Sequence, residues 1–508
     1  MAEIAPDKLE ELAALFPDAV RNITNEDGAP QRVVDLAIIA RQLPGRTVIE
    51  HPEQYELAWP GKKQAITESR APSRSSLVPE PEKSVNFETT DNLFIVGDNL
   101  EALKLLRDTH AASVDFIYID PPYNTGNSFV YADKFSVPSS VYAARSGDQR
   151  AQGRFHADWL NLMYPRLLLA RELLSEDGVG FVSIDANELA HLKLMIGEIF
   201  GAENLFSTIV WVSNLKGRQI SGAGPAGTHE YILCFARDAA TIRRFRGSAA
   251  KFQQLMPAIY RGRTYEIKHD AKGPYVTKNW LHNTNSRFNE QTAPTMVFRI
   301  HFNPDTGEIR VSDIDDDEVF PGFLTAMPHP NAQPGLNWHA WRWSRQRVLD
   351  DHDELEFDTT GGRLRIRTKI RDVDGMTLKD VVLGPATTTG QADLEALGMR
   401  RMFETPKPVE LIKLLLSVAA DDDALVLDFF AGSGSTAEAV MSLNATDAGV
   451  RRFIMVQLDE PCAPGSPAAK AGFNEISALC GERMKRAGNR IAATAPGVDV
   501  GFRRLRLG

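Results

Sequence analysis

Four consecutive residues, Asp120, Pro121, Pro122 and Tyr123, place a carboxylate, a rigid turn and an aromatic ring side by side. They follow Asp115–Ile119, whose apolar, β-branched and aromatic residues predict a buried parallel strand. Ligands of open α/β sheets bind beyond the carboxyl ends of strands, so Asp120 is expected in a binding crevice. The prolines fix the backbone and donate no N–H, which leaves carbonyl oxygens free to accept hydrogen bonds. These acceptors beside a flat ring suit a planar molecule with an exocyclic amine, such as a nucleobase flipped out of its helix.

A second stretch combines a strand, a carboxylate and a glycine turn. Ala424–Leu427 predicts a buried strand that ends on Asp428. The turn that follows contains Phe430, Gly432 and Gly434, and a helix is expected to begin directly after it. Glycines let the backbone approach a ligand closely, and a helix N-terminus faces it with free N–H groups. Gly-x-Gly occurs at many nucleotide sites, so the pattern alone indicates no particular ligand.

Two other turns could also hold a polar ligand. The strand expected at Phe453–Leu458 ends in Asp459-Glu460, and an acid at such a position is suited to ribose hydroxyls. After the strand expected at Leu93–Val96, Gly97–Asn99 opens a helix, with Asn99 as its expected N-cap. The second turn has the pattern of an ordinary strand-to-helix connection, so it is an equally good match to a structural role.

The length and the cysteines narrow the class of protein. A chain of 508 residues is long enough for three or four domains. No run of about 20 apolar residues exists, so no transmembrane helix is expected, and Met1–Asp7 lacks the features of a signal peptide. The three cysteines, Cys234, Cys462 and Cys480, are widely spaced, which favours reduced thiols in the cytoplasm and argues against a zinc site.

Charge is distributed unevenly along the chain. The formal net charge is −10, which taken alone argues against nucleic acid as a partner. Residues 241–300, however, contain 11 Lys and Arg against 3 Asp and Glu, and the next sixty residues have an acidic excess that includes Asp313 and Asp315–Glu318. We therefore expect separate basic and acidic surfaces, the first of them suited to phosphate contact.

The chain is expected to divide into four parts. Residues 1–85 form an N-terminal appendage that ends in a Ser/Pro/Glu-rich linker, Ser69–Ser84. Residues 86–240 and 401–508 alternate strands and helices, as two halves of one α/β core would. Residues 241–400 break that alternation, are rich in Tyr and Trp, and contain an expected hairpin at Gly361–Lys369. We interpret this part as an inserted domain that contacts nucleic acid, with a purely stabilising insert as the alternative.

Two loops carry further candidate residues. The first follows Asp120 and runs for about 35 residues, to Phe155; loops of this length are usually functional or disordered. Its aromatic residues and a lysine suit nucleic-acid binding; they are Phe129, Tyr131, Lys134 and Phe135. The second, glycine-rich loop leads to His229, for which we favour a structural hydrogen bond over a catalytic role.

Asp120–Tyr123 and Phe430-x-Gly432-x-Gly434 resemble the catalytic and cofactor motifs of the amino-group DNA methyltransferases. The catalytic motif comes first, an inserted region follows, and the cofactor motif comes last, which is similar to the order in the β class. Aspartate as the first residue of the catalytic motif resembles the N6-adenine enzymes, whereas the N4-cytosine enzymes usually have serine there.

Longer segments resemble the modification (Mod) subunit of Type III restriction–modification systems. They cover most of the chain outside the insert and are Trp59–Lys62, Asn92–Leu105, Ile117–Asn127, Gly153–Leu167, His229–Leu233, Lys407–Leu414 and Asp428–Thr436. The chain is short for that family. No Gly-x4-Gly-Lys-Ser/Thr motif is found, so DNA cleavage would need another chain.

The resemblance implies a fold and a set of site residues. The fold is the α/β class I S-adenosylmethionine-dependent methyltransferase fold, a seven-stranded, mostly parallel sheet with helices on both faces. Residues 86–240 would form its catalytic half, 401–508 its cofactor-binding half and 241–400 the target recognition domain. The implied catalytic residues are Asp120, Pro121, Pro122 and Tyr123. The implied S-adenosylmethionine-binding residues are Asp98, Asn99, Lys407, Pro408, Asp428, Phe430, Gly432, Gly434 and Glu460 (or Asp459), and no metal is expected.

The resemblance also implies an activity and partners. The activity is methylation of adenine N6 within a short sequence of double-stranded DNA, and the partners are a second copy of the chain and a helicase–nuclease restriction subunit. Two alternatives remain open. The same fold could methylate N4 of cytosine, or the chain could act mainly as a recognition subunit that delivers the nuclease to DNA.

Overall fold

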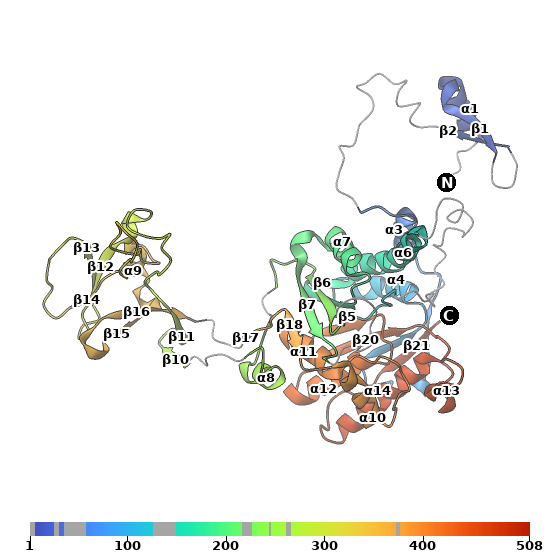
Figure 1. Ribbon diagram of the computed structural model, residues 1–508. Coiled ribbons are helices and arrows are strands. Elements are labelled where there is room, and N and C mark those ends of the chain that lie inside the picture. The colour runs from blue at the N-terminus through green and yellow to red at the C-terminus, as the bar shows by residue number, and fades with distance from the viewer. Residues whose placement is uncertain are drawn as a thin grey trace. The chain divides into compact units, whose positions relative to one another are not determined.

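The computed structural model describes residues 6–24, 30–34, 57–124, 149–215, 226–242, 245–260, 266–371 and 376–508 (Figure 1). The chain divides into two compact units, Met1–Ala58 and Trp59–Gly508. In the first unit, Pro6–Leu15 forms helix α1, and β1 (Val20–Thr24) pairs antiparallel with β2 (Pro30–Val34). None of the helices in these ranges is both long and apolar enough to cross a membrane.

A ten-stranded sheet forms the centre of the second unit. Its order is β18-β7-β8-β6-β5-β19-β20-β4-β21-β3, and all strands run parallel except β8 and β3. The bounds, in that order, are Val381–Leu383, Leu205–Val212, Glu230–Ala236, Leu174–Ile184, Val114–Ile119, Leu425–Asp428, Arg452–Gln457, Leu93–Val96, Arg503–Leu507 and Leu77–Pro79. The seven strands from β7 to β4 form the expected mostly parallel sheet, and β18, β21 and β3 extend its two edges.

The two central strands bring the two motif regions together. β5 and β19 are hydrogen-bonded neighbours in parallel register, with Leu427 opposite Ile117. Their apolar side chains are buried because helices cover both faces of the sheet. Asp120 and Asp428 therefore emerge at the same edge of the sheet, although about 300 residues separate them in the chain.

Helices lie on both faces of the sheet (Figure 1). One group packs around α6 and comprises α3 (Lys62–Arg70), α4 (Asn99–His110), α6 (Gln149–Leu173) and α7 (Leu189–Phe200). The other packs around α12 and comprises α11 (Val409–Ala419), α12 (Ser435–Asp447) and α14 (Ile476–Ala492). The shorter helices are α8 (Ala249–Leu255), α10 (Thr387–Ala396) and α13 (Pro467–Lys470).

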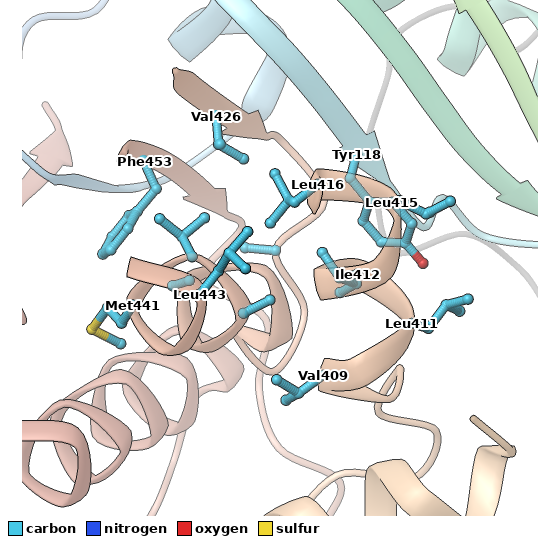
Figure 2. Packing of buried hydrophobic residues seen from close by; sticks show 14 of the residues in the cluster. Tyr118, Val409, Leu411, Ile412, Leu415, Leu416, Val426, Met441, Leu443 and Phe453 are labelled. Carbon is cyan, nitrogen blue, oxygen red and sulfur yellow. The ribbon is translucent and has the colours of Figure 1, made fainter. Parts of the chain in front are cut away.

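Helix α11 shows how the core positions the site. Seven of its eleven residues are buried, and its leucines pack between the sheet and α12 (Figure 2). Tyr118 of β5 lies beside it on the sheet side, and Phe453 of β20 belongs to the same cluster but lies toward α12. Since Lys407 lies two residues before α11, this packing fixes the lysine beside the ends of β5 and β19.

Two small sheets form a body of their own within the segment interpreted as an insert. One has the order β10-β11-β16-β15 (Lys268–Asp270, Gly273–Trp280, Arg365–Ile370 and Leu355–Asp358), and the other has the order β13-β12-β14 (Ile309–Asp313, Phe298–Phe302 and Leu324–Ala326). A separate core joins them to α9 (Arg345–Asp350); it includes Leu281, Phe298, Ile300, Trp341, Val348 and Leu355. The expected hairpin is present as β15–β16, with Gly361 and Gly362 in its turn at positive φ. Outside this body, β9 (Arg246–Gly247) pairs with β17 (Met376–Thr377).

The linker predicted at Ser69–Ser84 is wrong. Leu77–Pro79 forms the edge strand β3, and Glu80 accepts a hydrogen bond from Arg504 Nε at 2.8 Å. The two residues of that bond are 424 positions apart in the chain. No local pattern could indicate a strand whose partner is so distant.

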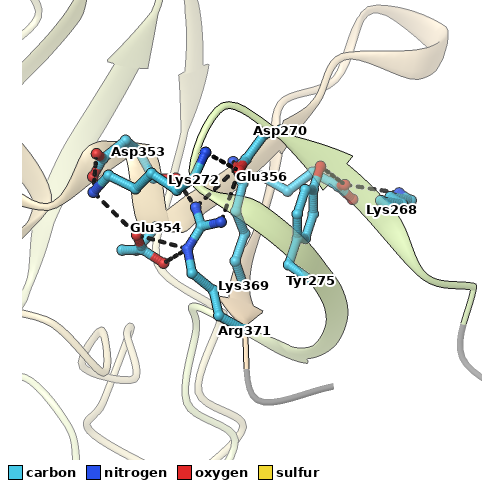
Figure 3. Close-up of polar contacts among 9 residues, drawn as sticks. All are labelled: Lys268, Asp270, Lys272, Tyr275, Asp353, Glu354, Glu356, Lys369 and Arg371. Carbon is cyan, nitrogen blue, oxygen red and sulfur yellow. Dashed lines mark hydrogen bonds and ion pairs between the residues drawn. The ribbon is translucent and has the colours of Figure 1, made fainter. Parts of the chain in front are cut away.

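The expected separation of basic and acidic surface is also wrong for much of the insert (Figure 3). Lys268 pairs with Glu356 at 2.7 Å, and Lys272 pairs with Asp353 and Glu354. Arg371 contacts Asp270 and Glu354, both at 2.7 Å. The antiparallel sheet places the basic segment directly beside the acidic one, so much of the basic excess is neutralised internally.

Candidate active site

Asp120 lies directly after β5 and is paired with a cation. Lys407 Nζ donates to both of its carboxylate oxygens at 2.8 Å and to the Tyr123 hydroxyl at 2.8 Å. The lysine side chain is only 10% exposed, and Glu230 Oε2 lies 3.6 Å from its ammonium. The sequence assigned Lys407 to the cofactor; the structure places its ammonium beside Asp120 and Tyr123, which were predicted to be catalytic.

Tyr123 is held as a neutral phenol. Its hydroxyl donates to Glu230 Oε2 at 2.9 Å, and the Lys407 ammonium lies 4.9 Å from the centre of its ring. Burial raises the pKa of Tyr123 well above its usual range, and the carboxylates of Asp120 and Glu230 add to the effect. The ring can therefore offer a face to a flat ligand without titrating at physiological pH.

Helix α6 holds the proline turn from one side. The indole of Trp159 is fully buried, and its Nε1 donates to the carbonyl of Pro122 at 2.7 Å. That bond engages the carbonyl of Pro122. The carbonyl of Pro121 is the one that we expect to accept a hydrogen bond from a ligand. A turn held by a buried tryptophan is rigid, as the two prolines predicted.

Asp428 ends β19 and is buried, and no Lys or Arg in the described part of the chain forms an ion pair with it. Its carboxylate accepts from the backbone N–H of Phe430 at 3.0 Å and from the Thr436 hydroxyl at 2.6 Å. Burial raises its pKa to about 7, and the two hydrogen bonds oppose that shift. The carboxyl of Asp428 therefore pins the glycine turn to the start of α12.

A pocket joins the two strand ends. Its lining includes Asp120, Lys407, Asp428, Phe430, Ser433 and Thr436. The chemistry of this lining, with carboxylates, hydroxyls and an aromatic ring around a glycine turn, fits an adenosine-type cofactor beside the catalytic turn. Pro408 is the N-cap residue of α11, at the edge of this lining.

The glycines of the turn have conformations that other residues rarely adopt. Gly432 and Gly434 have φ of 55° and 84°. The N–H of Gly432 donates to Gln457 Oε1 at 2.7 Å, which ties the turn to β20. A side chain at Gly434 would lie 3.2 Å from the sulfur of Cys480 on α14, so the turn also packs tightly against that helix.

Asp98 and Asn99 support the cofactor turn from the side. Asp98, and not Asn99 as predicted, is the N-cap of α4, since its side chain accepts from the N–H groups of Leu100 and Glu101. Asn99 is buried and donates to the carbonyl of Phe429 at 2.7 Å, directly after β19. The fully buried Arg166 binds Asn99 Oδ1 at 2.6 Å and lies 3.4 Å from Asp98.

The two acids after β20 differ in their partners. Asp459 binds Ser477 and Arg506; although burial acts in the opposite direction, these bonds hold its pKa below the usual value. Burial raises the pKa of Glu460. Of the two, Glu460 is therefore the better candidate for a ribose acid, because Asp459 is already engaged.

The other sequence candidates are placed as follows. His229 is exposed and hydrogen-bonds the Tyr231 hydroxyl at 3.0 Å, as its structural interpretation predicted. Phe129, Tyr131, Lys134 and Phe135 lie outside the described residues. Sequence reasoning missed Glu230, whose position directly after His229 at the start of an apolar strand was the available signal.

Residues 114–462 match the family model described as DNA methylase. The Type III restriction-modification enzyme EcoPI Mod subunit of Escherichia phage P1 is 31% identical over 474 residues, which cover 89% of this chain and 71% of the relative. The StyLTI Mod subunit of Salmonella typhimurium is 31% identical over 514 residues, covering 93% and 69%. The Type II methyltransferase M.KpnI of Klebsiella pneumoniae is 29% identical, covering 78% and 88%.

Among solved structures, the PvuII DNA methyltransferase (cytosine-N4-specific) aligns with a TM-score of 0.34 and 12% identity, covering 80% of this chain and 94% of that one. The family model spans more than half of the chain and includes both strand ends of the pocket. The chain therefore belongs to the DNA methylase family and is an S-adenosylmethionine-dependent DNA methyltransferase of the class I fold that acts on DNA.

Proposed function

We propose that the chain methylates N6 of an adenine that is flipped out of a short, specific DNA sequence, as the modification subunit of a Type III-like restriction–modification system. One observation carries the proposal. The turns that begin at Asp120 and Asp428 lie at the ends of adjacent strands, and Asp120, Asp428 and Phe430 line one pocket between them.

The residues of the catalytic turn have separate tasks. The adenine ring stacks on Tyr123, and its amino group donates to Asp120 and to the carbonyl of Pro121. These acceptors raise the electron density on N6 and direct its lone pair toward the pocket. Bound S-adenosylmethionine supplies a methyl group activated by a sulfonium. Positioning of N6 supplies much of the rate, because the groups are held in place before reaction.

The cofactor would be held by the second set of residues. Phe430, Gly432 and Gly434 bring backbone and an aromatic ring to it, and Glu460 is suited to its ribose hydroxyls. Asp98 and Asn99 act from behind by holding the backbone at Phe429. Lys407 donates to both oxygens of Asp120, and each oxygen keeps a second lone pair that can accept a hydrogen bond from the adenine amine.

The target base and the partners rest on similarity. Aspartate at position 120 favours adenine over cytosine N4, and the Mod relatives favour a role in restriction–modification. We further propose a homodimer, a helicase–nuclease partner and a cytoplasmic location. A chain that mainly delivers the nuclease to DNA would recognise the same DNA sequence with the same fold. The alternative therefore differs only in which of the two roles, methylation or delivery, is the main one.

The test is methylation of unmethylated plasmid DNA by the purified protein with S-adenosylmethionine, followed by single-molecule sequencing of modified bases. We expect N6-methyladenine in one short motif. Asp120→Ala should lower the rate by ~10²–10⁴, the range for positioned polar catalysts. Asp185→Asn is the matched control, because this carboxylate also follows a strand of the sheet but bonds its own turn at Asn187.

Digestion of the product to nucleosides separates the alternatives. N4-methylcytosine in place of N6-methyladenine would contradict the proposed target. Cofactor binding without methylation would show that another subunit or another substrate is required, and no cofactor binding would refute the assignment of the glycine turn.

A further inference from the structure

The residue after the catalytic tyrosine is held in an unusual backbone conformation. Asn124 has a φ of 56°, in the left-handed region that few non-glycine residues adopt. Asparagine tolerates this region better than most residues, but its propensity alone does not hold a loop there. The side-chain Nδ2 of Asn124 donates to Glu188 Oε1, so a contact across the site fixes the end of the catalytic turn.

Glu188 is itself fixed by two histidines. The glutamate is fully buried; Oε1 bonds Nδ1 of His156 at 2.6 Å, and Oε2 bonds Nδ1 of His191 at 2.8 Å. The two imidazole rings lie 4.5 Å apart. Among the described residues, no lysine or arginine forms an ion pair with this carboxylate. A buried carboxylate is costly unless hydrogen bonds satisfy it, so the three donors hold it in one geometry.

The same helix holds the turn on the other side of the tyrosine. His156 and Trp159 lie three residues apart on α6, and Trp159 binds the carbonyl of Pro122. Residues directly before and directly after Tyr123 are thus fastened to one helix, the second of them through Glu188. The hydroxyl of Tyr123 is fastened separately, to Glu230.

We infer that Glu188, oriented by His156 and His191, is a positioning residue for the methyl-transfer reaction: it acts through Asn124 to hold the ring of Tyr123 where the target base stacks. The inference rests on the proposed function. Glu188 touches neither Asp120 nor the cofactor pocket, so its substitution should change the chemical step and leave cofactor binding unchanged. A displacement of about 1 Å at a reacting group can cost ~10² in rate.

The experiment compares Glu188→Ala, Glu188→Gln and Asn124→Ala in the full chain. We expect Glu188→Ala to lower kcat by ~10², with KM and Kd for S-adenosylmethionine within about twofold of wild type. Glu188→Gln keeps the side-chain volume and one acceptor oxygen, so its kcat should lie between that of the wild type and that of Glu188→Ala. Because both residues act through one contact, the double variant Asn124→Ala/Glu188→Ala should be no slower than the slower single variant.

Glu198→Gln is the matched control. Glu198 lies on α7, the helix that begins directly after Glu188, and it also bonds a side chain of α6, the hydroxyl of Tyr164 at 2.5 Å, but it has no contact with the catalytic turn. Its kcat should be unchanged. Fluorescence of 2-aminopurine at the target position should report weaker capture of the flipped base in Glu188→Ala and not in Glu198→Gln.

Several outcomes would overturn the inference. They are an unchanged kcat in Glu188→Ala of an active enzyme, effects of the two single variants that multiply in the double variant, or a parallel loss of cofactor affinity. Two imidazoles and a carboxylate can also hold a divalent metal ion, so a stoichiometric ion in the purified protein that His191→Ala removes would overturn it as well. A wild-type protein that methylates no adenine would refute the proposed function and this inference together, whereas the other outcomes refute this inference alone.

Discussion

Asp120 and Asp428 are carboxylates at the ends of neighbouring strands, yet they differ in their hydrogen-bond partners and in their burial. Asp120 faces the ammonium of Lys407, whereas Asp428 is buried and accepts hydrogen bonds from the N–H of Phe430 and the hydroxyl of Thr436. Burial raises the pKa of Asp428 to about 7, so a large share of this carboxyl is protonated at neutral pH. Two residues of the same type are thus held differently, one by an ammonium and the other by an N–H and a hydroxyl.

Asp428 should make stability depend on pH. Its folded pKa of about 7 exceeds the unfolded value of 3.8, so the folded state binds more protons between these values. Stability from this group is present below about pH 4 and is lost as pH rises to 7, by on the order of 4 kcal/mol. In Asp428→Asn that dependence should disappear, and the Tm of the variant relative to wild type should increase from pH 4 to 8. The exposed Asp421→Asn is the control, and a constant difference in Tm for Asp428→Asn would contradict the prediction.

At the scale of elements, helix α14 supports the glycine turn through a buried arginine. Arg483 is fully buried; it pairs with Glu438 of α12 at 2.8 Å and donates to the hydroxyls of Ser433 and Ser435. The turn before α12 is thus held from β19, β20 and α14 at once. Such convergence explains how a short glycine-rich segment can have one defined conformation.

Replacing Arg483 should cost both stability and cofactor affinity. Arg483→Met leaves Glu438 buried without its inner partner, and breaking a buried pair costs about 3–5 kcal/mol. Arg490→Met is the matched control, because Arg490 contacts the same glutamate from the surface at 2.7 Å and such pairs contribute about 1 kcal/mol or less. Urea unfolding and titration with S-adenosylmethionine measure the two effects. Equal losses in the two variants would refute this role of the buried pair.

At the scale of the whole molecule, the two small sheets within residues 268–371 form a body with its own core and its own ion pairs, whereas Phe252, Tyr260 and Val382 belong to the core of the large sheet. Pairing leaves fewer cations for DNA than the sequence suggests, because lysines such as Lys272 already face carboxylates. Arg287 and Arg363 are exposed, and neither forms an ion pair within the described ranges of the chain. These two arginines are the better candidates for phosphate contact.

Their removal should weaken DNA binding in a salt-dependent way. Arg287→Ala/Arg363→Ala should lower affinity for specific and non-specific duplexes alike, and each lost phosphate contact should reduce the slope of log K against log salt by about 0.9. Lys272→Ala should change the slope little, since its ammonium is neutralised internally. Fluorescence anisotropy at salt concentrations from about 50 to 200 mM, over which the affinity of such proteins for DNA usually falls steeply, measures the affinity and the slope. An unchanged slope in the double variant would exclude these arginines from the interface.

Much of the fold could be predicted because the central strands are short apolar runs that end at an acidic residue or a glycine turn. Leu93–Val96 forms as predicted, Asp115–Ile119 and Ala424–Leu427 form within one residue of prediction, and both motif acids follow strands that are adjacent in the sheet. Local apolar runs and glycine turns contain that information. The catalytic and cofactor roles came from resemblance to a family and stay predictions; of the residues assigned to them, Asp120, Lys407, Asp428 and Phe430 line one pocket.

What escaped prediction depends on partners far apart in the chain. Edge strand β3 exists only because β21 lies beside it, and the charge pattern of the insert misled because antiparallel strands bring opposite charges together. Glu230 and Glu188 resemble ordinary charged residues in the sequence, and only the folded chain turns them toward Tyr123 and Asn124. Side-chain networks of this kind have no periodic signature.

The strand order has a consequence for how the protein is made. β4 and β5 follow one another in the chain, but β20 and β19 separate them in the sheet. About 300 residues must leave the ribosome between the end of β5 and the start of β19, which takes about 15–60 s at ~5–20 residues per second. During that time β4 and β5 lack the strands that lie between them in the finished sheet, so their backbone N–H and C=O groups are open to pairing with other chains. A nascent chain therefore has no complete cofactor site until β19 and the turn after it have left the ribosome.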